Sequence, residues 1–336
     1  MLRLPTESDH KRYLVRVVIL NLGIICIVIG KIQGLRYLIA FGAVAVVTSA
    51  GLHARSIQIQ ISKALPTRFK KIPRFYIASS VFLILGGILG GVLSQSPHGE
   101  MKYQILVAHY SSNIFGWIGI TVAGTLITLI PTVLRTQLPE SAENRGYKSL
   151  PWLMISVVSL VSGALLNNRS IALLGILTYL GAWFFLLSSH LRFVFQKRSP
   201  FSFYSIIFAI IWLIIALINL AVDFAISHTW ELVTDRAENL IYMLGIGFAL
   251  QIGLGALSYL IPVVLGGGSA KARRNANISE QLKISRLVTL NLGLGLLVVD
   301  ISRLFFLFGG ALITLSLIFN LSLLASLRPT IRNHLE

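Results

Sequence analysis

The sequence predicts an all-α, polytopic integral membrane protein with about ten transmembrane helices. The chain of 336 residues is 55% hydrophobic and only 12% charged, whereas soluble domains carry about 25% charged residues. Its mean hydropathy is +0.79. Apolar runs long enough to cross about 30 Å of hydrocarbon recur along the chain, at 14–30, 37–53, 75–94, 103–134, 151–166, 170–191, 203–225, 239–265, 285–301 and 304–327.

The runs themselves explain how the helices follow one another. Basic residues precede the first run, but no small-residue cleavage site follows Gly30, which predicts a retained first helix. The fifth and sixth runs are separated only by residues 167–169, which predicts a tight antiparallel hairpin. Four glycines in the third run permit close approach of a neighbouring helix, and they are Gly86, Gly87, Gly90 and Gly91. Gly266-Gly267-Gly268-Ser269 lacks the spacing of a phosphate-binding loop and predicts a flexible cytoplasmic turn.

The distribution of charge predicts the orientation. The chain has 29 Lys and Arg residues against 12 Asp and Glu residues, and most of the basic residues lie in segments that share one side of the ten predicted helices. The positive-inside rule makes that side cytoplasmic, so we expect both termini inside, in a bacterial plasma membrane. Anionic lipid headgroups are the expected partner of this charge, and nucleic acid is not. Cys26 is the only cysteine, which excludes a disulfide framework or an iron–sulfur site.

An internal repeat organises the chain. Three arginines at helix starts are each followed six residues later by glycine, and the pairs are Arg36 with Gly42, Arg169 with Gly175, and Arg303 with Gly309. Residues 115–134 and 246–265 are identical at eight of twenty positions, each matched 131 positions apart. These similarities predict a four-helix unit at 1–135, a second four-helix unit with a cytoplasmic loop at 136–284, and a final two-helix hairpin with a short tail at 285–336.

The fourth run carries a polar ridge, in which successive members lie three or four residues apart. Its members are His109, Asn113, Trp117, Thr121, Thr125, Thr128, Thr132 and Thr136. This spacing places them one helical turn apart along one face. Two interpretations of the threonines stay open: Thr121, Thr125, Thr128 and Thr132 line a transport path, or their hydroxyls bond backbone carbonyls within the helix.

Histidines suggest two kinds of ligand site. His109 lies within a predicted helix near the outer side, where His98, His228 and Asp223 complete a set of nitrogen and oxygen donors suited to copper or zinc. The alternative is that these residues do not meet in space. His53 and His190 lie at the cytoplasmic interface, where they could ligate haem or only extend toward headgroups.

One segment also supports a resemblance to a known family. The stretch His109-x-Ser111-x-Asn113-x-x-Gly116-Trp117, with Gly124 and Pro131 further on, resembles the membrane module of actinobacterial proteins related to multicopper oxidases and copper nitrite reductases. Residues 255–268 look like the second signature of that module. The family pattern has a second histidine where this chain has Ser111, and we expect no copper oxidase domain after Arg328. The chain is more distantly similar to subunit I of haem–copper oxidases and to a haem- and copper-containing membrane family of nitric-oxide stress.

The resemblance implies a non-catalytic membrane component linked to copper or haem redox metabolism, with a ligand site near His109 on the outer side. His109, Asn113 and Trp117 are the residues that it implies for this site, and haem and copper are the candidate cofactors. A copper-containing redox protein is the implied partner. A small-solute or proton-coupled transporter and a ligand-free membrane scaffold are the alternatives, and no catalytic residue is assigned.

Overall fold

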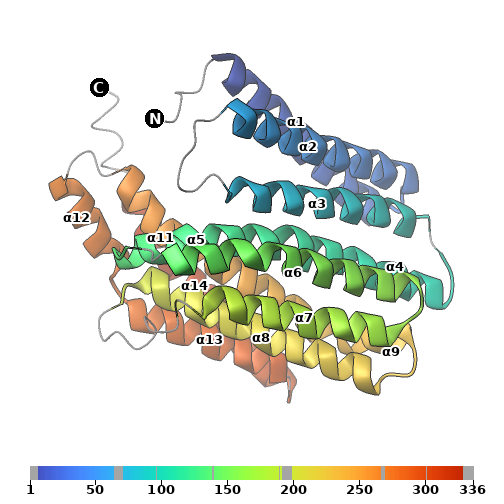
Figure 1. Cartoon of the computed structure of the whole chain (residues 1–336). Coiled ribbons are helices and arrows are strands. Elements are labelled where there is room, and N and C mark those ends of the chain that lie inside the picture. The colour runs from blue at the N-terminus through green and yellow to red at the C-terminus, as the bar shows by residue number, and fades with distance from the viewer. Residues whose placement is uncertain are drawn as a thin grey trace. The chain divides into compact units, whose positions relative to one another are not determined.

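The described part of the chain contains helices and no strands, as predicted. The structure is a computed structural model that describes residues 7–63, 71–95, 97–137, 140–188, 190, 199–265, 269–299 and 301–327. Within these ranges ten helices are long and apolar enough to cross a membrane, which agrees with the ten predicted apolar runs and makes the chain a multi-pass membrane protein by helix length and composition. Figure 1 shows the helices in chain order.

The chain forms two compact units, which we describe separately. The first contains Met1–Ile127, Pro139–Ser189 and Ala221–Asp235, and the second contains Thr128–Leu138, His190–Leu220 and Arg236–Glu336. The predicted divisions after residues 135 and 284 follow the sequence repeat and remain predictions.

The helices of the first unit are α1 (Glu7–Gln33), α2 (Arg36–Lys63), α3 (Pro73–Leu93), α4 (Glu100–Ser111), the π-helix η1 (Ser112–Gly119), α6 (Glu140–Leu165), α7 (Arg169–Leu187) and α9 (Trp230–Arg236). The second unit holds α10 (Glu238–Leu240), the π-helix η3 (Ile241–Leu250), α11 (Gln251–Val264), α12 (Ser269–Ser279), α13 (Lys283–Val299) and α14 (Arg303–Ala325). Residues of both units belong to α5 (Ile120–Leu134) and to α8 (Phe201–Ile226).

The predicted helix ends needed correction where helices continue past the apolar run. We expected a helix to start at Pro151, but α6 begins eleven residues earlier and Pro151 lies inside it. The segment from Glu140 is polar, so hydropathy alone gives no sign of a helix there. Gly266, Gly267 and Gly268 of the predicted flexible turn lie outside the described residues, and Ser269 begins α12.

Two π-helical segments interrupt the longest runs at matching positions. η1 ends at Gly119 and η3 ends at Leu250, and these residues are 131 positions apart, as in the sequence repeat. In each case an α-helix with an internal proline follows, Pro131 in α5 and Pro262 in α11. π-helices are rare, and they are frequent at functional sites. Their occurrence at corresponding positions of two similar segments favours a structural role for the wide turn.

An aromatic side chain packs against a glycine of each π-helix, Gly116 of η1 and Gly247 of η3. A Cβ at Gly116 would lie 2.5 Å from Cβ of Phe82 on α3, and a Cβ at Gly247 would lie 2.6 Å from Cγ of Trp212 on α8. Glycine is therefore required at both positions, because the ring fills the space that a side chain would take.

The α1–α2 and α13–α14 hairpins share their contacts. Gly23 crosses Gly42, and Gly293 crosses Gly309, with the backbone of one glycine against the other. Residues 16–23 and 286–293 both read Arg-x-Val-x-Leu-Asn-Leu-Gly. Ser49 donates to the Arg16 carbonyl at 2.9 Å, and Ser316 donates to the Arg286 carbonyl at 2.8 Å. The two hairpins are therefore the same local structure, made twice.

Alanine at Gly309 is expected to lower the free energy of unfolding by about 1–3 kcal/mol, because the new Cβ overpacks the helix crossing. It would lie 2.7 Å from the carbonyl oxygen of Gly293, which is backbone and cannot turn aside. Gly310 is the matched control, since nothing lies within 4 Å of a Cβ there. Unfolding in mixed detergent micelles measures both variants, and equal losses would contradict this packing.

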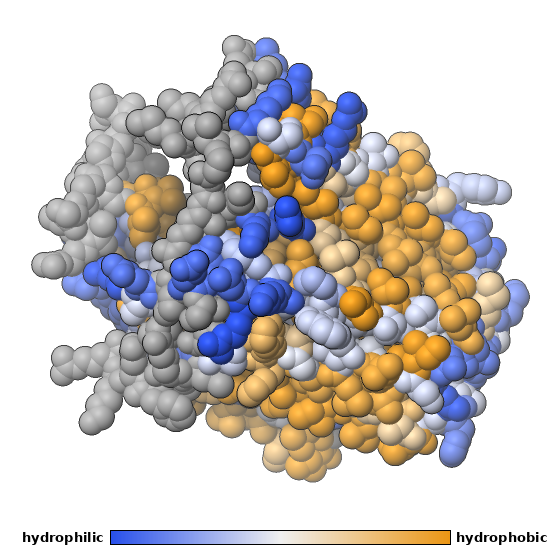
Figure 2. Space-filling view, in the orientation of Figure 1, coloured by the Kyte–Doolittle hydropathy of each residue, from blue (hydrophilic) through white to orange (hydrophobic). Residues whose placement is uncertain are grey.

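Apolar side chains make up much of the exterior. Figure 2 shows them gathered over a broad area of one face, with hydrophilic residues on either side of that area. On α1 the exposed apolar residues include Val15, Val18 and Ile25, each at least half exposed. Such surfaces suit contact with lipid or with another membrane helix.

Candidate functional site

The His109 side chain packs into a space that glycines of α3 leave open. His109 and Asn113 lie one turn apart on α4 and η1, and Gly90 and Gly86 lie one turn apart on α3. A Cβ at Gly90 would lie 2.8 Å from Cε1 of His109, and a Cβ at Gly86 would lie 2.5 Å from the Asn113 amide. Two of the four predicted close-packing glycines, Gly86 and Gly90, therefore accommodate this pair, with matching spacings on two neighbouring helices.

Hydrogen bonds fix the orientation of the imidazole. Nδ1 of His109 lies 2.8 Å from the Gly86 carbonyl oxygen, and a carbonyl can only accept, so Nδ1 carries the proton. In the neutral ring the lone pair is then on Nε2. Asn113 donates through Nδ2 to the His109 backbone carbonyl at 2.9 Å. A ligating histidine commonly donates its other ring N–H to a backbone carbonyl, which fixes the tautomer and the orientation of the ring.

Trp117, the third residue of the predicted site, lies on η1 and is 37% exposed. A π-helix bonds each residue to the one five positions on, so a turn holds more residues than the 3.6 of an α-helix. Steps of four therefore drift less around the axis between Asn113 and Trp117 than they would in an α-helix. The wide turn helps the first part of the ridge, from His109 to Trp117, to keep to one face.

The donors predicted to join His109 in a metal site are not brought together. His98 and His228 are exposed, and Asp223 is half-buried on α8. In the ranges that the structure describes, no three His, Cys, Asp or Glu side chains form a group that could hold a metal ion. These residues come from separate loops and helices. Their predicted location on the same side of the membrane does not by itself place them in contact.

The two histidines predicted to lie at the cytoplasmic interface belong to different units. His53, on α2 of the first unit, is exposed, while His190 is buried and belongs to the second unit. The hypothesis that they bind haem stays a prediction.

The threonine hydroxyls make hydrogen bonds within their own helix. Thr125 donates to the Thr121 carbonyl at 2.8 Å, and Thr132 donates to the Thr128 carbonyl at 2.6 Å. Tyr76 of α3 lies 3.1 Å from the Thr125 hydroxyl, which can accept because its proton is already donated. These bonds favour the packing interpretation of the ridge over a transport path.

A polar network around Arg286 in the second unit was not predicted from the sequence. Arg286 is 1% exposed, and its guanidinium faces the Phe201 ring with 3.6 Å between the Cζ atom and the ring centroid. It donates to the carbonyls of Ser279 and Gln281 at 2.7 and 3.3 Å, which close the C-terminal end of α12. Its other donors reach the Asn320 side chain, at 3.1 and 2.6 Å, and the Ser258 hydroxyl at 3.3 Å. Five donors thus meet neutral oxygens.

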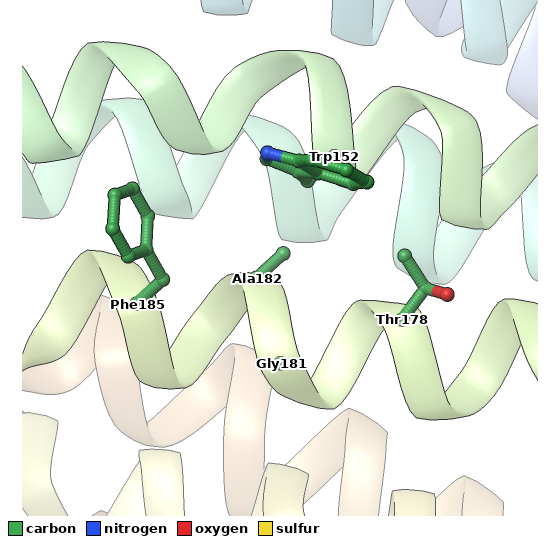
Figure 3. Close-up of a pocket in the computed structure, with 5 residues that line it drawn as sticks. All are labelled: Trp152, Thr178, Gly181, Ala182 and Phe185. Atoms are coloured by element: carbon green, nitrogen blue, oxygen red, sulfur yellow. The ribbon is translucent and has the colours of Figure 1, made fainter.

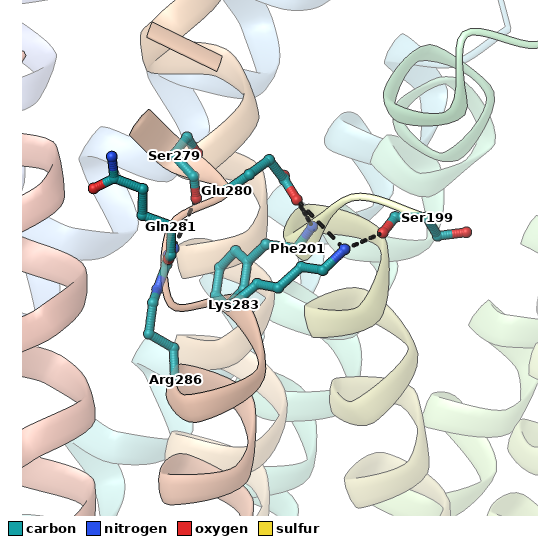
Figure 4. A network of polar contacts seen from close by, with 7 residues as sticks. All are labelled: Ser199, Phe201, Ser279, Glu280, Gln281, Lys283 and Arg286. Atoms are coloured by element: carbon teal, nitrogen blue, oxygen red, sulfur yellow. Dashed lines mark hydrogen bonds and ion pairs between the residues drawn. The ribbon is translucent and has the colours of Figure 1, made fainter. Parts of the chain in front are cut away.

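The same turn also caps α8. Both carboxylate oxygens of Glu280 lie 3.0 Å from the backbone nitrogen of Phe201, the first residue of α8, where an anion complements the helix dipole. Lys283 lies 4.0 Å from Glu280 and donates to the Ser199 carbonyl at 3.3 Å. Figure 4 shows these side chains extending from the turn between α12 and α13. All of these contacts are structural, since they satisfy helix ends.

A second unpredicted cluster surrounds Trp230 at the start of α9, in the first unit. Trp230 is 1% exposed, and its indole donates to Oδ1 of Asn167 at 2.6 Å. Its backbone nitrogen donates to Glu100 at 2.8 Å, and Tyr103 donates to Glu231. Arg169 binds the Ser227 carbonyl just beyond the end of α8. The cluster fastens a short helix to α4 and to the α6–α7 turn.

A hollow of about 330 Å³ lies between α6 and α7 and does not include the predicted site. Figure 3 shows Trp152 of α6 above Thr178, Ala182 and Phe185 of α7. Trp152 is 55% exposed and Phe185 is 36% exposed, so the hollow is an open apolar groove on the surface.

Among the predicted site residues, His109 and Asn113 are thus the pair whose orientation is fixed by hydrogen bonds. The polar network around Arg286 was not predicted from the sequence. Comparisons of the chain with protein-family models, with curated proteins and with solved structures found no match.

Proposed function

We propose that this protein is a non-catalytic component of the bacterial plasma membrane, linked to copper or haem redox metabolism, in which His109 receives a ligand at the outer side. The observation that carries the proposal is the bond from Nδ1 of His109 to the Gly86 carbonyl. It holds the ring against α3 and leaves Nε2 as the ligating atom.

The site supplies one ligand and not a complete centre. A copper site needs further donors, and the described residues offer no group of three His, Cys, Asp or Glu side chains. Haem iron could be bound by one histidine, but the described groove at Trp152 and Phe185 lies between other helices. We therefore propose that His109 acts with donors of a copper-containing redox partner, as one half of a shared site.

Orientation and repeat belong to the same proposal. The excess of Lys and Arg in alternate segments supports cytoplasmic termini and a contact with anionic headgroups there. The matching ends of η1 and η3, and the shared contacts of the two hairpins, support two four-helix repeats and a final half repeat.

A ligand-free scaffold is the second candidate, because the bond that orients His109 also joins α4 to α3. The transporter hypothesis has less support, since the hydroxyls of Thr125 and Thr132 are used inside the helix.

Spectroscopy separates the first two candidates. Purified protein in lipid nanodiscs is titrated with haem and, separately, with Cu(I), while visible absorption and metal content are measured. We expect one equivalent to bind weakly, and His109→Ala to lose at least about tenfold in affinity, a difference of about 1.4 kcal/mol. His228→Ala removes an exposed histidine and serves as the control. Equal binding by both variants, or no binding by the wild type, would leave the scaffold as the function.

A further inference from the structure

The outward face of α1 carries an asparagine near the middle of the predicted span. Asn21 is exposed, and the span that contains it runs from His10 to Gln33. Its Nδ2 donates to the Val17 carbonyl at 2.7 Å, which turns Oδ1 outward. In the part of the chain that the structure describes, no donor is bonded to this oxygen. An amide oxygen at this depth in hydrocarbon is costly unless another helix supplies a donor.

The equivalent residue of the second unit shows what such an oxygen binds. Asn291 occupies the same place in the shared Arg-x-Val-x-Leu-Asn-Leu-Gly segment, and its Nδ2 donates to the Leu287 carbonyl at 2.8 Å. Its Oδ1 accepts the indole N–H of Trp212 on α8 at 2.8 Å. The same asparagine geometry is therefore used inside this chain to join two helices, whereas among the described residues no second helix binds Oδ1 of Asn21.

The surroundings of Asn21 form a regular seam. Six exposed side chains follow the alternating four-three spacing of a coiled coil, and they are Leu14, Val18, Asn21, Ile25, Val28 and Ile32. The five apolar members are 45–75% exposed. Gly23 and Gly30 lie on the other side of α1, against α2. This pattern differs from that of a helix which meets lipid alone, because the seam places a polar residue at its centre.

We propose that the chain forms a dimer through this seam, with α1 of one copy parallel to α1 of the other. Two copies in one membrane share an orientation, so a two-fold axis along the membrane normal makes their α1 helices parallel. The second Nδ2 hydrogen of each Asn21 donates to Oδ1 of the other, so the pair is self-complementary, as a two-fold interface requires. Val18, Ile25 and Ile32 place β-branched side chains at alternate seam positions, the preference of two-stranded coiled coils, and a polar seam residue fixes register.

Site-directed cross-linking tests the dimer in native membranes. In a Cys26→Ala background, single cysteines at Val18→Cys and Ile25→Cys are expected to give covalent dimers on oxidation. Val44→Cys on α2, where the native side chain is 64% exposed, is the control and is expected to give none. Equal cross-linking at Ile25→Cys and Val44→Cys would overturn the proposal, because it would indicate random collision.

The asparagine itself needs its own variant. Asn21→Leu is expected to lower cross-linking at Ile25→Cys about three- to tenfold, the range of one interhelical polar contact. Asn219→Leu is the matched control, since Asn219 is also exposed and also donates to a carbonyl one turn back. The dimer proposal would be overturned if the wild type is monomeric in nanodiscs, or if the seam of α1 cross-links only to a different protein. These outcomes do not depend on ligand binding at His109.

Discussion

Arg286→Met is expected to lower the free energy of unfolding by about 3 kcal/mol, because each buried acceptor left without a donor costs about 1–3 kcal/mol. The carbonyls of Ser279 and Gln281 and the Asn320 side chain would all lose their donor. Arg286→Lys is expected to be more stable than Arg286→Met and less stable than the wild type, since an ammonium group cannot donate to all of the same oxygens. Unfolding by SDS in mixed micelles, followed by tryptophan fluorescence, measures the change.

Arg16 provides the matched control within the same chain. It occupies the equivalent position of the first hairpin, but its guanidinium donates to the Arg12 carbonyl at 3.2 Å in an exposed setting. Arg16→Met is expected to change the free energy of unfolding by less than about 0.5 kcal/mol. Equal losses at both positions would mean that the network around Arg286 contributes nothing beyond the arginine stem.

Gly90→Ala is expected to weaken ligand binding at His109 by about tenfold, or about 1.4 kcal/mol, and to destabilise the protein by about 1–3 kcal/mol through overpacking. The added Cβ would lie 2.8 Å from Cε1 and 3.1 Å from Nδ1 of His109. The ring must then move, and the bond from Nδ1 to the Gly86 carbonyl lengthens or breaks.

Gly91→Ala is the control for this variant. A Cβ at Gly91 would lie 3.6 Å from Cβ of Ala43, which is an ordinary contact, so stability and affinity are expected to hold. Haem and Cu(I) titrations measure affinity, and detergent unfolding measures stability. If Gly90→Ala lowers stability but leaves the affinity for haem and Cu(I) unchanged, the position of the His109 ring does not affect binding. That result would count against His109 as a ligand.

Much of the fold was predictable because hydropathy reports directly on membrane spans. The ten apolar runs became ten long helices, and the short turn at 167–169 forms as expected, with Asn167 in the left-handed region at φ 54° and Asn168 capping α7. The polar start of α6 was missed because a helix outside the hydrocarbon need not be apolar. The π-helices were missed because no residue type marks an i to i+5 bond.

The candidate site was predicted in part. His109 and Asn113 were identified, and so were the glycines of the third helix, but as separate features. The signal that joins them is the equal spacing of four between Gly86 and Gly90 and between Asn113 and His109. Arg286 was missed because two of its partners are backbone carbonyls, which leave no trace in the sequence, and its side-chain partners Asn320 and Ser258 lie on other helices about 30 residues away. The metal set stays a prediction: the described residues form no group of three donors, and His98 and His228 come from loops whose positions the sequence does not specify.

The most direct test of the central claim is nitrogen-15 NMR of histidine-labelled protein in nanodiscs, with His109→Ala to assign the resonances. We predict that His109 is protonated at Nδ1, and that its Nε2 resonance shifts on addition of Cu(I) or haem while those of His98 and His228 keep their positions. A proton on Nε2, or an Nε2 resonance that both ligands leave unchanged, would contradict the account.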